Sequence, residues 1–381
     1  MLISITYSEI MIKGGKRRFF ENLLIRNALA ALGGGRDFRV SKGGGRILLR
    51  SDAHEDAAAA REALTRTFGT DSVTFPREAK ADMADIERTA LMDASRMVGK
   101  SIRVDAKRSD KSFPLTSPQV NSVIGKALVG AGCTVDLENP DITVSIEILQ
   151  GKALVFTERY HGPGGLPVGS SGKVLSLLSG GIDSPVSSWM MMKRGCAVDF
   201  LHLHSSPENK DVMESKMSRI LRVLRTYSPA PLRVHVAPYS EFYKKSMSLD
   251  PKIELVMFRR FLFRLSNALA AKHRYKGVVT GDSVGQVASQ TLDNIFASDA
   301  AATIPVYRPL AGMNKQEIID LAKKIGTFAP SIEPYKDCCS LVAHKSPSTK
   351  VRLEDAEKAE EAAGMAGIVE KTLSLSQCFE A

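Results

Sequence analysis

Long apolar runs and a cysteine framework are both missing from this sequence of 381 residues. No apolar run approaches the ~18 residues that a helix needs to cross a bilayer, which excludes a membrane-spanning helix. The N-terminal stretch lacks the basic segment, long apolar core and small-residue cleavage site of a secretory signal peptide. The five cysteines are few and scattered, so we expect no disulfide framework and a reducing, cytoplasmic location.

Metal-binding cysteine spacing is also absent. No Cys-x-x-Cys pair occurs, so neither an iron–sulfur nor a zinc site has its usual spacing, and the sequence predicts no resident metal site. Cys133, Cys196 and Cys378 have no chemical neighbour in the sequence and are interpreted as structural. Cys338 and Cys339 are adjacent, which makes them the exception.

Positive charge is present in excess and is unevenly placed. The net charge is +10, and residues 1–50 alone hold ten Lys and Arg against three Asp and Glu. Residues 51–100 reverse the balance, with seven basic and ten acidic side chains. Clustered positive charge is typical of proteins that bind nucleic acid, although a merely soluble basic protein has the same balance.

The pattern of elements predicts an α/β protein with three domains. Residues 1–78 read as strand, helix, two strands, helix and strand, which indicates a ferredoxin-like α+β domain. Residues 79–162 form a second α+β domain, and residues 163–172 are a Gly-, Pro- and Ser-rich linker. Residues 173–381 alternate apolar strands with helices, which predicts a Rossmann-like parallel sheet with ligands beyond the carboxyl ends of its strands.

The stretch Ser-Gly-Gly-Ile-Asp-Ser, residues 179–184, follows the first strand of that sheet and is called the phosphate loop below. Successive glycines let backbone N–H groups turn inward as an anion site, and the following helix adds its positive N-terminal end. No Gly-Lys-Ser/Thr follows it and it contains no Gly-x-Gly-x-x-Gly, so it is neither a Walker loop nor a dinucleotide fingerprint. An ordinary strand-to-helix turn is the alternative.

Several long segments carry a family resemblance. In chain order they are YSEIMIKGGKRRFFE from Tyr7, RSDKSFPLTS from Arg108, GGLPVGSSGKVLSLLSGGIDSPV from Gly164, TGDSVGQVASQTLDN from Thr280, RPLAGMNKQEII from Arg308 and DCCSLVAHKSP from Asp337. The phosphate loop resembles that of the adenylating PP-loop ATP pyrophosphatases. Over almost its whole length the chain resembles the tRNA 4-thiouridine synthetases, or tRNA sulfurtransferases, except that Ser8 stands where the family usually has Gly.

The resemblance implies that residues 79–162 are an RNA-binding THUMP domain and that residues 173–381 bind ATP with Mg²⁺. The implied ATP-binding residues are Leu177, Leu178, Ser179, Gly180, Gly181, Asp183, Ser184, His202, Leu203, Arg259, Gly281 and Gln290. Asp183 is expected to orient Mg²⁺ and Lys315 to stabilise charge on the phosphates.

Plainer interpretations remain open for individual positions. His202 is equally compatible with a hydrogen-bonded histidine at a strand end, and Lys315 with an exposed lysine on a helix. Arg259 and Arg260 are adjacent in an apolar helix, so we expect one of them to face solvent. Gly281 is compatible with a plain turn.

In the family that the chain resembles, a cysteine of the last segment takes part in sulfur transfer, and Cys339 is the first choice here and Cys338 the second. Lys336, His344 and Lys345 would favour a thiolate by their charge. One buried and one incidental cysteine is the alternative. The chain as given ends too soon for the rhodanese domain that some members carry, so we expect a separate persulfide donor, a cysteine desulfurase or a carrier.

The resemblance implies an enzyme that adenylates uridine 8 of tRNA and replaces its C4 oxygen with persulfide sulfur to give 4-thiouridine. It also implies a homodimer and a sulfur-transfer role in thiamine thiazole synthesis, which the missing rhodanese domain weakens. Arg17, Arg18 and Lys111 are the predicted tRNA contacts, with solvated surface charge as the alternative. Two other functions stay open: adenylation with a different nucleophile, and tRNA binding without catalysis.

Overall fold

The computed structural model describes residues 1–34, 38–52, 56–335, 338, 342 and 347–381. Contacts divide the chain into two units, Met1–Gly165 and Leu166–Ala381, and each has hydrophobic cores of its own. Within the described residues, no helix combines the length and the apolar composition that crossing a membrane requires.

The first half of the first unit is ferredoxin-like, as predicted. Its elements are β1 (Leu2–Thr6), η1 (Glu9–Lys16), α1 (Arg17–Ala31), β2 (Arg39–Gly43), β3 (Arg46–Arg50), α2 (Ala57–Leu64) and β4 (Ser72–Thr74). Together with β10 (Tyr160–His161), the strands form an antiparallel sheet in the order β10-β4-β1-β3-β2. Ile3 and Ile5 of β1 face the same side because side chains alternate along a strand, and they pack on Leu24 of α1 and Leu64 of α2.

The second half of the first unit is the predicted second α+β domain. Its elements are β5 (Arg77–Lys80), α3 (Met83–Leu91), η2 (Ala94–Arg96), β6 (Ser101–Arg108), α4 (Ser117–Gly130), β7 (Thr134–Val135), β8 (Ile142–Leu149), β9 (Lys152–Phe156) and β10 (Tyr160–His161). Its sheet has the order β5-β9-β8-β6-β7, and β10 leaves it to pair with β4. A reciprocal cap between Thr116 and Gln119 fixes the start of α4.

The second unit is the predicted Rossmann-like domain. Its strands are β11 (Lys173–Leu177), β12 (Ala197–His204), β13 (Arg233–Pro238), β14 (Val278–Val279), β15 (Val306–Tyr307) and β16 (Gln377–Glu380). Its helices are α5 (Asp183–Lys193), α6 (Asn209–Glu214), α7 (Lys216–Arg225), α8 (Ser240–Ser246), α9 (Glu254–His273), η3 (Ala288–Gln290), α10 (Leu292–Asp299), α11 (Lys315–Ile325), α12 (Phe328–Ser331), α14 (Leu353–Ala362) and α15 (Met365–Ser374).

The sheet of the second unit has a topological switch point beside its first strand. The order is β15-β14-β11-β12-β13-β16, parallel except for the β13–β16 pair. The chain builds outward from β11 to β13 and then returns to the other side of β11 with β14. Such a switch point opens a crevice at the carboxyl ends of the strands, where ligands of open α/β sheets bind.

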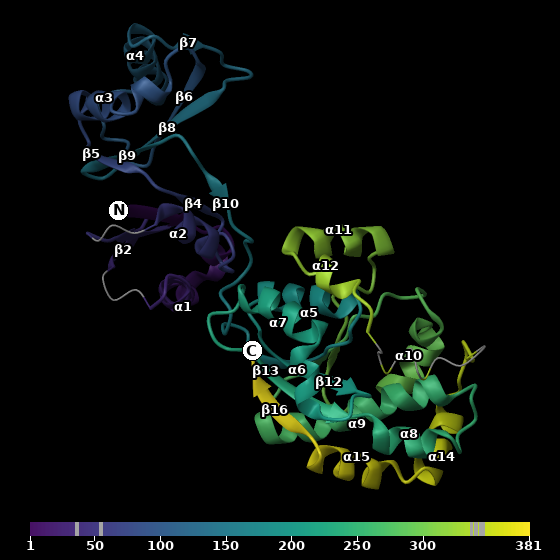
Figure 1. Cartoon of the computed structure of the whole chain (residues 1–381). Helices are drawn as coiled ribbons and strands as arrows, with labels where there is room; N and C mark the ends of the chain where they lie inside the picture. The colour runs from purple at the N-terminus through teal and green to yellow at the C-terminus, as the bar shows by residue number, and fades with distance from the viewer. Residues whose placement is uncertain (35–37, 53–55, 336–337, 339–341, 343–346) are drawn as a thin grey trace. The chain divides into compact units, whose positions relative to one another are not determined.

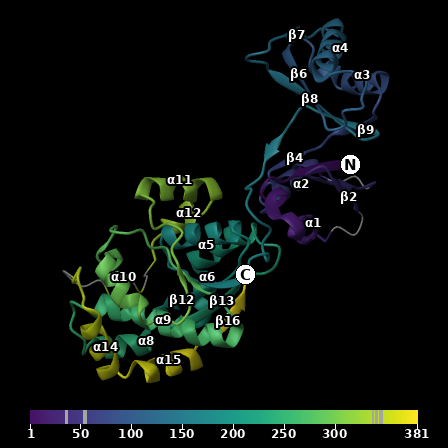
Figure 2. The same ribbon diagram turned by 180° about the vertical axis from the view of Figure 1, so that it is seen from behind.

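Helices cover both faces of this sheet. Figures 1 and 2 show α5 and α7 over one face and α8, α9 and α15 over the other. The core below α9 is aromatic: the rings of Phe242 and Phe261 stack at 5.0 Å, and Phe258 meets Phe242 edge-on at 5.5 Å. Phe242 belongs to α8 and the other two rings to α9, so this packing joins the two helices. The same hydrophobic cluster includes Leu175 of β11 and Leu201 of β12.

Part of the expected linker, residues 163–172, packs on the second unit. The backbone N–H of Leu166 donates to the Lys193 carbonyl, and the N–H groups of Gly169 and Ser171 donate to that of Gly195. These bonds satisfy backbone groups that a free linker would leave to water. From Leu166 onward the segment is therefore part of the second unit.

The expectation that Arg259 or Arg260 faces solvent is wrong. The Arg260 side chain is 1% exposed, pairs with Glu360 of α14 and donates to the Ala297 carbonyl at 2.6 Å. Arg259 turns to the other side of α9, where its side chain is 14% exposed. Both charges are compensated inside the protein, because a buried guanidinium without an anion is costly.

A buried polar network lies at the opposite ends of the strands, near the amino ends of β11 and β12. The Tyr275 hydroxyl donates to Asp199 at 2.7 Å and lies 2.9 Å from His235 Nε2. Lys173 pairs with Asp199 at 2.6 Å. Burial, reinforced by the charge of His273, lowers the pKa of His235 to about 4.

This histidine predicts acid sensitivity of the second unit. In the unfolded chain His235 binds a proton near pH 6.5, as histidine ordinarily does. Between pH 6.5 and 4 the unfolded state therefore binds more protons, and stability falls as pH falls, by about 2–3 kcal/mol over that range. We expect His235→Gln to reduce this pH dependence.

The measurement is urea unfolding at several pH values, followed by fluorescence of Trp189, the single tryptophan, which lies in α5 and so reports the second unit. Equal pH dependence in the wild type and in His235→Gln would contradict the assignment.

Candidate active site

The phosphate loop is closed on itself by its two serines. The Ser179 backbone N–H donates to Ser184 Oγ at 2.9 Å, and the two hydroxyls lie 3.1 Å apart. The Gly181 N–H donates to Ser179 Oγ at 3.3 Å. The loop leads from β11 directly into α5, whose positive N-terminal end adds to its attraction for anions.

Two glycines are required by close approach of other groups. A Cβ on Gly281 would lie 2.8 Å from the Ser184 backbone nitrogen and 3.0 Å from the Asp183 carbonyl carbon. A Cβ on Gly180 would lie 2.8 Å from Cδ1 of Tyr335. Gly281 is therefore more than a plain turn: it lets the chain after β14 lie against the first turn of α5.

A pocket of about 220 Å³ opens at the carboxyl ends of β11 and β14. Its lining includes ten of the predicted site residues: Leu177, Leu178, Ser179, Asp183, Ser184, Leu203, Arg259, Gly281, Gln290 and Cys338. Gly180, Gly181, His202 and Lys315 are not among the lining residues. The pocket thus combines an apolar floor with the phosphate loop, a guanidinium and a thiol.

Asp282 organises the polar side of the pocket, and sequence reasoning missed it. Its carboxylate accepts two hydrogen bonds from Arg259, one from Arg308 at 3.1 Å and one from Thr280 at 2.7 Å. The residue is 3% exposed. Burial would raise the pKa of Asp282, but the charge of Arg259 and the bonds from Arg259 and Thr280 hold that pKa below its usual value.

Arg308 extends this network outward, since it also binds Asp299 at 2.8 Å. Asp282 follows β14 and Arg308 follows β15, and both lie in segments quoted for the family resemblance. Their position just after a strand could have marked them as candidate site residues from the sequence. Gln290 Nε2 reaches Asp282 at 3.5 Å, whereas its Oε1 is buried in the described structure with no hydrogen-bond partner.

Asp183 and Lys315 meet although 132 positions separate them. Lys315 Nζ lies 2.5 Å from Asp183 Oδ1, and Gln286 Nε2 donates to Oδ2 at 3.1 Å. Asn314 caps α11 and so fixes where Lys315, its first residue, begins the helix. Lys315 is therefore paired with the phosphate-loop carboxylate rather than simply exposed on its helix.

His202 is not among the residues that line the pocket. Successive side chains of a strand point to opposite faces, so Leu203 lines the pocket and His202 does not. The His202 ring is 1% exposed and lies 2.8 Å from both the Leu178 carbonyl and the Tyr335 hydroxyl. Its contacts are thus with Tyr335 and with the backbone of Leu178, the residue that precedes the phosphate loop.

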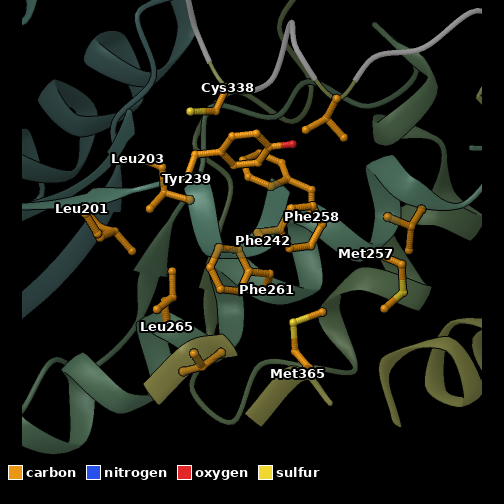
Figure 3. Packing of buried hydrophobic residues seen from close by; sticks show 14 of the residues in the cluster. Leu201, Leu203, Tyr239, Phe242, Met257, Phe258, Phe261, Leu265, Cys338 and Met365 are labelled. Carbon is orange, nitrogen blue, oxygen red and sulfur yellow. The ribbon is translucent and has the colours of Figure 1, made fainter. Parts of the chain in front are cut away.

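Cys338 lines the pocket and is buried, with 1% exposed. It belongs to the hydrophobic cluster of the second unit, and Figure 3 shows it at the edge of that cluster, near Leu203 and Tyr239. Cys339 lies outside the described residues, as do Lys336, His344 and Lys345. Cys133 and Cys196 are buried and Cys378 is exposed in β16, away from this pocket.

The predicted RNA contacts differ in their surroundings. Arg17 donates to Glu21 at 2.7 Å and to the Tyr7 hydroxyl at 3.2 Å, so it already has partners within its own domain. Arg18 and Lys111 are exposed on the first unit.

The donor set fits a magnesium ion that arrives with a nucleotide. Among the described residues, no group of three or more His, Cys, Asp or Glu side chains converges as a resident metal site would require. Mg²⁺ commonly binds through one or two carboxylates together with substrate phosphates and water. The Asp183 carboxylate beside the phosphate loop meets that requirement.

We expect Asp282→Asn to destabilise the second unit by about 3–5 kcal/mol, because it leaves the Arg259 and Arg308 charges together without their shared anion. Urea unfolding followed by Trp189 fluorescence measures this. Asp299→Asn is the matched control: its side chain is 31% exposed, so the loss of its bond to Arg308 is expected to cost about 1 kcal/mol or less. Equal losses for the two variants would contradict the central role of Asp282.

Comparison with known proteins extends over the whole chain. Residues 169–365 match the model of the family described as thiamine biosynthesis protein (ThiI), residues 80–158 match the THUMP domain and residues 2–74 match the ThiI ferredoxin-like domain. A solved structure titled as a 4-thiouridine synthetase–RNA complex with bound ATP aligns with 100% of this chain and 99% of its own, at 32% identity and a TM-score of 0.88.

Named relatives agree with this match. A probable tRNA sulfurtransferase of Caldanaerobacter subterraneus subsp. tengcongensis is 38% identical over 94% of both chains. One of Moorella thermoacetica is 40% identical over 93% of this chain and 92% of its own. Identity at this level over nearly the full length leaves one conclusion: the chain belongs to the ThiI family of tRNA sulfurtransferases.

Proposed function

We propose that this tRNA sulfurtransferase adenylates uridine 8 of tRNA and then exchanges the C4 oxygen for persulfide sulfur. One observation carries the proposal: a single pocket is lined both by Cys338 and by Ser179, Asp183 and Ser184 of the phosphate loop. Activation of an oxygen by ATP and attack by sulfur need these two groups within reach of the same atom. The family named above supports tRNA as the substrate, as does the THUMP match of residues 80–158.

ATP would bind with its phosphates on the loop N–H groups and its base over the apolar floor. The buried Gln290 Oε1, which has no partner in the described structure, is suited to accept from an adenine amino group. Leu177 and Leu203 would pack on the base. Arg259, held by Asp282, and Lys315, held by Asp183, would supply positive charge from two sides.

Mg²⁺, when bound with ATP, would be held by Asp183 together with the phosphates and would neutralise part of their charge. Residues of the protein would stabilise the remaining negative charge of the phosphates. The Ser179 and Gly181 N–H groups, which donate to serine hydroxyls in this structure, would exchange these partners for phosphate oxygens when ATP binds. Lys315, the first residue of α11, would stabilise the negative charge that develops on pyrophosphate.

In the first step, the uracil O4 bonds to the α-phosphorus of ATP, the bond from that phosphorus to the β-phosphate oxygen breaks, and the N3 proton is lost. Pyrophosphate leaves and the base carries AMP on its former carbonyl oxygen. In the second step, the terminal sulfur of a donor persulfide attacks C4, and AMP leaves with the oxygen. Cys338 or Cys339 then attacks the sulfur–sulfur bond, which leaves sulfur on C4 and forms a disulfide with the donor cysteine.

The donor would be a cysteine desulfurase or a persulfide carrier, and an external thiol would reduce the disulfide. Arg18 and Lys111 are the proposed tRNA contacts; Arg17, which binds Glu21 and Tyr7, would contribute less. Homodimerisation is proposed on family resemblance. A role in supplying thiazole sulfur is proposed on the family's description as a thiamine biosynthesis protein.

We expect Asp183→Asn to slow tRNA-dependent pyrophosphate release by about 100-fold, because it removes the charge that orients Lys315 and the metal. Asp293→Asn is the matched control, since Asp293 also lies in the first turn of a helix but does not line the pocket. Full activity in Asp183→Asn would refute the assignment of this carboxylate.

We expect Cys338→Ser/Cys339→Ser to release pyrophosphate at close to the wild-type rate but to form no 4-thiouridine, since the serines cannot resolve a persulfide. Nucleoside mass spectrometry of unmodified tRNA incubated with ATP, Mg²⁺ and a persulfide source measures the product. Cys378→Ser, which changes an exposed thiol of β16, should behave as wild type. Thiolation that persists without both cysteines would reopen the identity of the group that resolves the persulfide.

The same assay separates the remaining functions. Pyrophosphate release without a sulfur requirement would indicate another nucleophile, and tRNA binding without pyrophosphate release would indicate a binding protein.

A further inference from the structure

Tyr335 and His202 form a partly buried connection to Leu178, the residue before the phosphate loop, and the proposed function does not use this connection. His202 Nδ1 lies 2.8 Å from the Leu178 carbonyl, and His202 Nε2 lies 2.8 Å from the Tyr335 hydroxyl. A carbonyl only accepts, so Nδ1 carries a proton and donates it. In the neutral ring Nε2 then accepts from Tyr335, which assigns every hydrogen in the connection.

The Tyr335 ring lies directly on the phosphate loop. The space for a Cβ at Gly180 is taken by the ring, with Cδ1 at 2.8 Å from that position. His202 and Tyr335 therefore contact this stretch at two places, at the Leu178 carbonyl just before the phosphate loop and at the Gly180 backbone within it. A side chain at Gly180 would separate them.

Lys216, the first residue of α7, holds the chain that leads to Tyr335. Its ammonium donates to the Ser331 carbonyl at 2.8 Å and to the Glu333 carbonyl at 2.7 Å, and it lies 5.6 Å from the centre of the Tyr335 ring. The Lys216 side chain is buried, so these contacts are made in a low-dielectric environment where they are strong. Residues 331–335 are thus fixed beside the phosphate loop.

Cys338 follows Tyr335 by three residues, which limits the distance between their Cα atoms to about 11 Å. The position of Tyr335 therefore restricts where the Cys338 thiol can stand in the pocket. His202 and the Tyr335 hydroxyl thus link Leu178, just before the phosphate loop, to a residue that the main chain joins to Cys338.

Resting on the proposed function, we propose that Tyr335 is a positioning residue that couples occupation of the phosphate loop to sulfur transfer. Tyr335→Phe keeps the ring on Gly180 and beside Lys216 but removes the bond to His202. Adenylation depends on the phosphate loop and should continue. Sulfur transfer additionally needs the Cys338 thiol at a fixed position relative to the loop. We expect 4-thiouridine formed per pyrophosphate released to fall about tenfold, since small misplacements in an active site have effects of this size or larger.

Tyr275→Phe is a matched control. The Tyr275 hydroxyl also lies against a histidine, 2.9 Å from His235 Nε2, but at the amino ends of the strands. Tyr275 is buried, whereas Tyr335 is partly buried. Both variants lose a tyrosine–histidine hydrogen bond, and Tyr275→Phe also loses the bond to Asp199, so both are expected to lose stability. Only Tyr335→Phe should change the ratio of the two products.

The experiment measures pyrophosphate and 4-thiouridine in the same reaction of full-length protein with tRNA, ATP, Mg²⁺ and a persulfide source. A lowered ratio in Tyr335→Phe and a wild-type ratio in Tyr275→Phe supports the proposal. A wild-type ratio in Tyr335→Phe, or a proportional loss of both products, overturns it. Absence of 4-thiouridine with the wild-type protein would instead be a failure of the proposed function.

Discussion

In the second unit, the backbone after β14 lies so close to the first turn of α5 that only glycine fits at position 281. This contact depends on the order of the strands, because β14 returns beside β11 after β12 and β13 have been laid down on the other side. It brings Asp282 and Thr280 to the carboxyl end of β11, close to the phosphate loop. Without that approach the pocket would have a loop but no charged wall opposite it.

Helix α9 takes part in two ion-pair networks, and both stabilise the second unit. Arg259 faces the pocket and binds Asp282, while its neighbour Arg260 faces away and binds Glu360 of α14. The orientation of one fixes that of the other, since successive residues of a helix differ by about 100°. Through this helix, the geometry of the pocket depends on a helix near the C-terminus that does not line it.

Local pattern was enough to predict the ferredoxin-like domain, the parallel sheet and the phosphate loop, because alternation, helix periodicity and loop composition are properties of short segments. Family resemblance added Arg259, Gln290 and Cys338, which line one pocket. What escaped prediction depends on contacts between distant segments. The role of Asp282 requires Arg259 and Arg308 to meet, and His202 could be placed only once Tyr335 was seen beside it.

The antiparallel strand β16 pairs with β13 at the edge of an otherwise parallel sheet, and the backbone of Ala381 exchanges hydrogen bonds with that of Leu232. Residues 377–380 are the last described strand in the sequence, so on the ribosome they are made after all the strands they complete. At roughly 5–20 residues per second, the edge of β13 stays unpaired from its own synthesis until some seconds later. During that interval it offers a row of open backbone groups to other chains, so this edge of the nascent chain needs protection from wrong pairing.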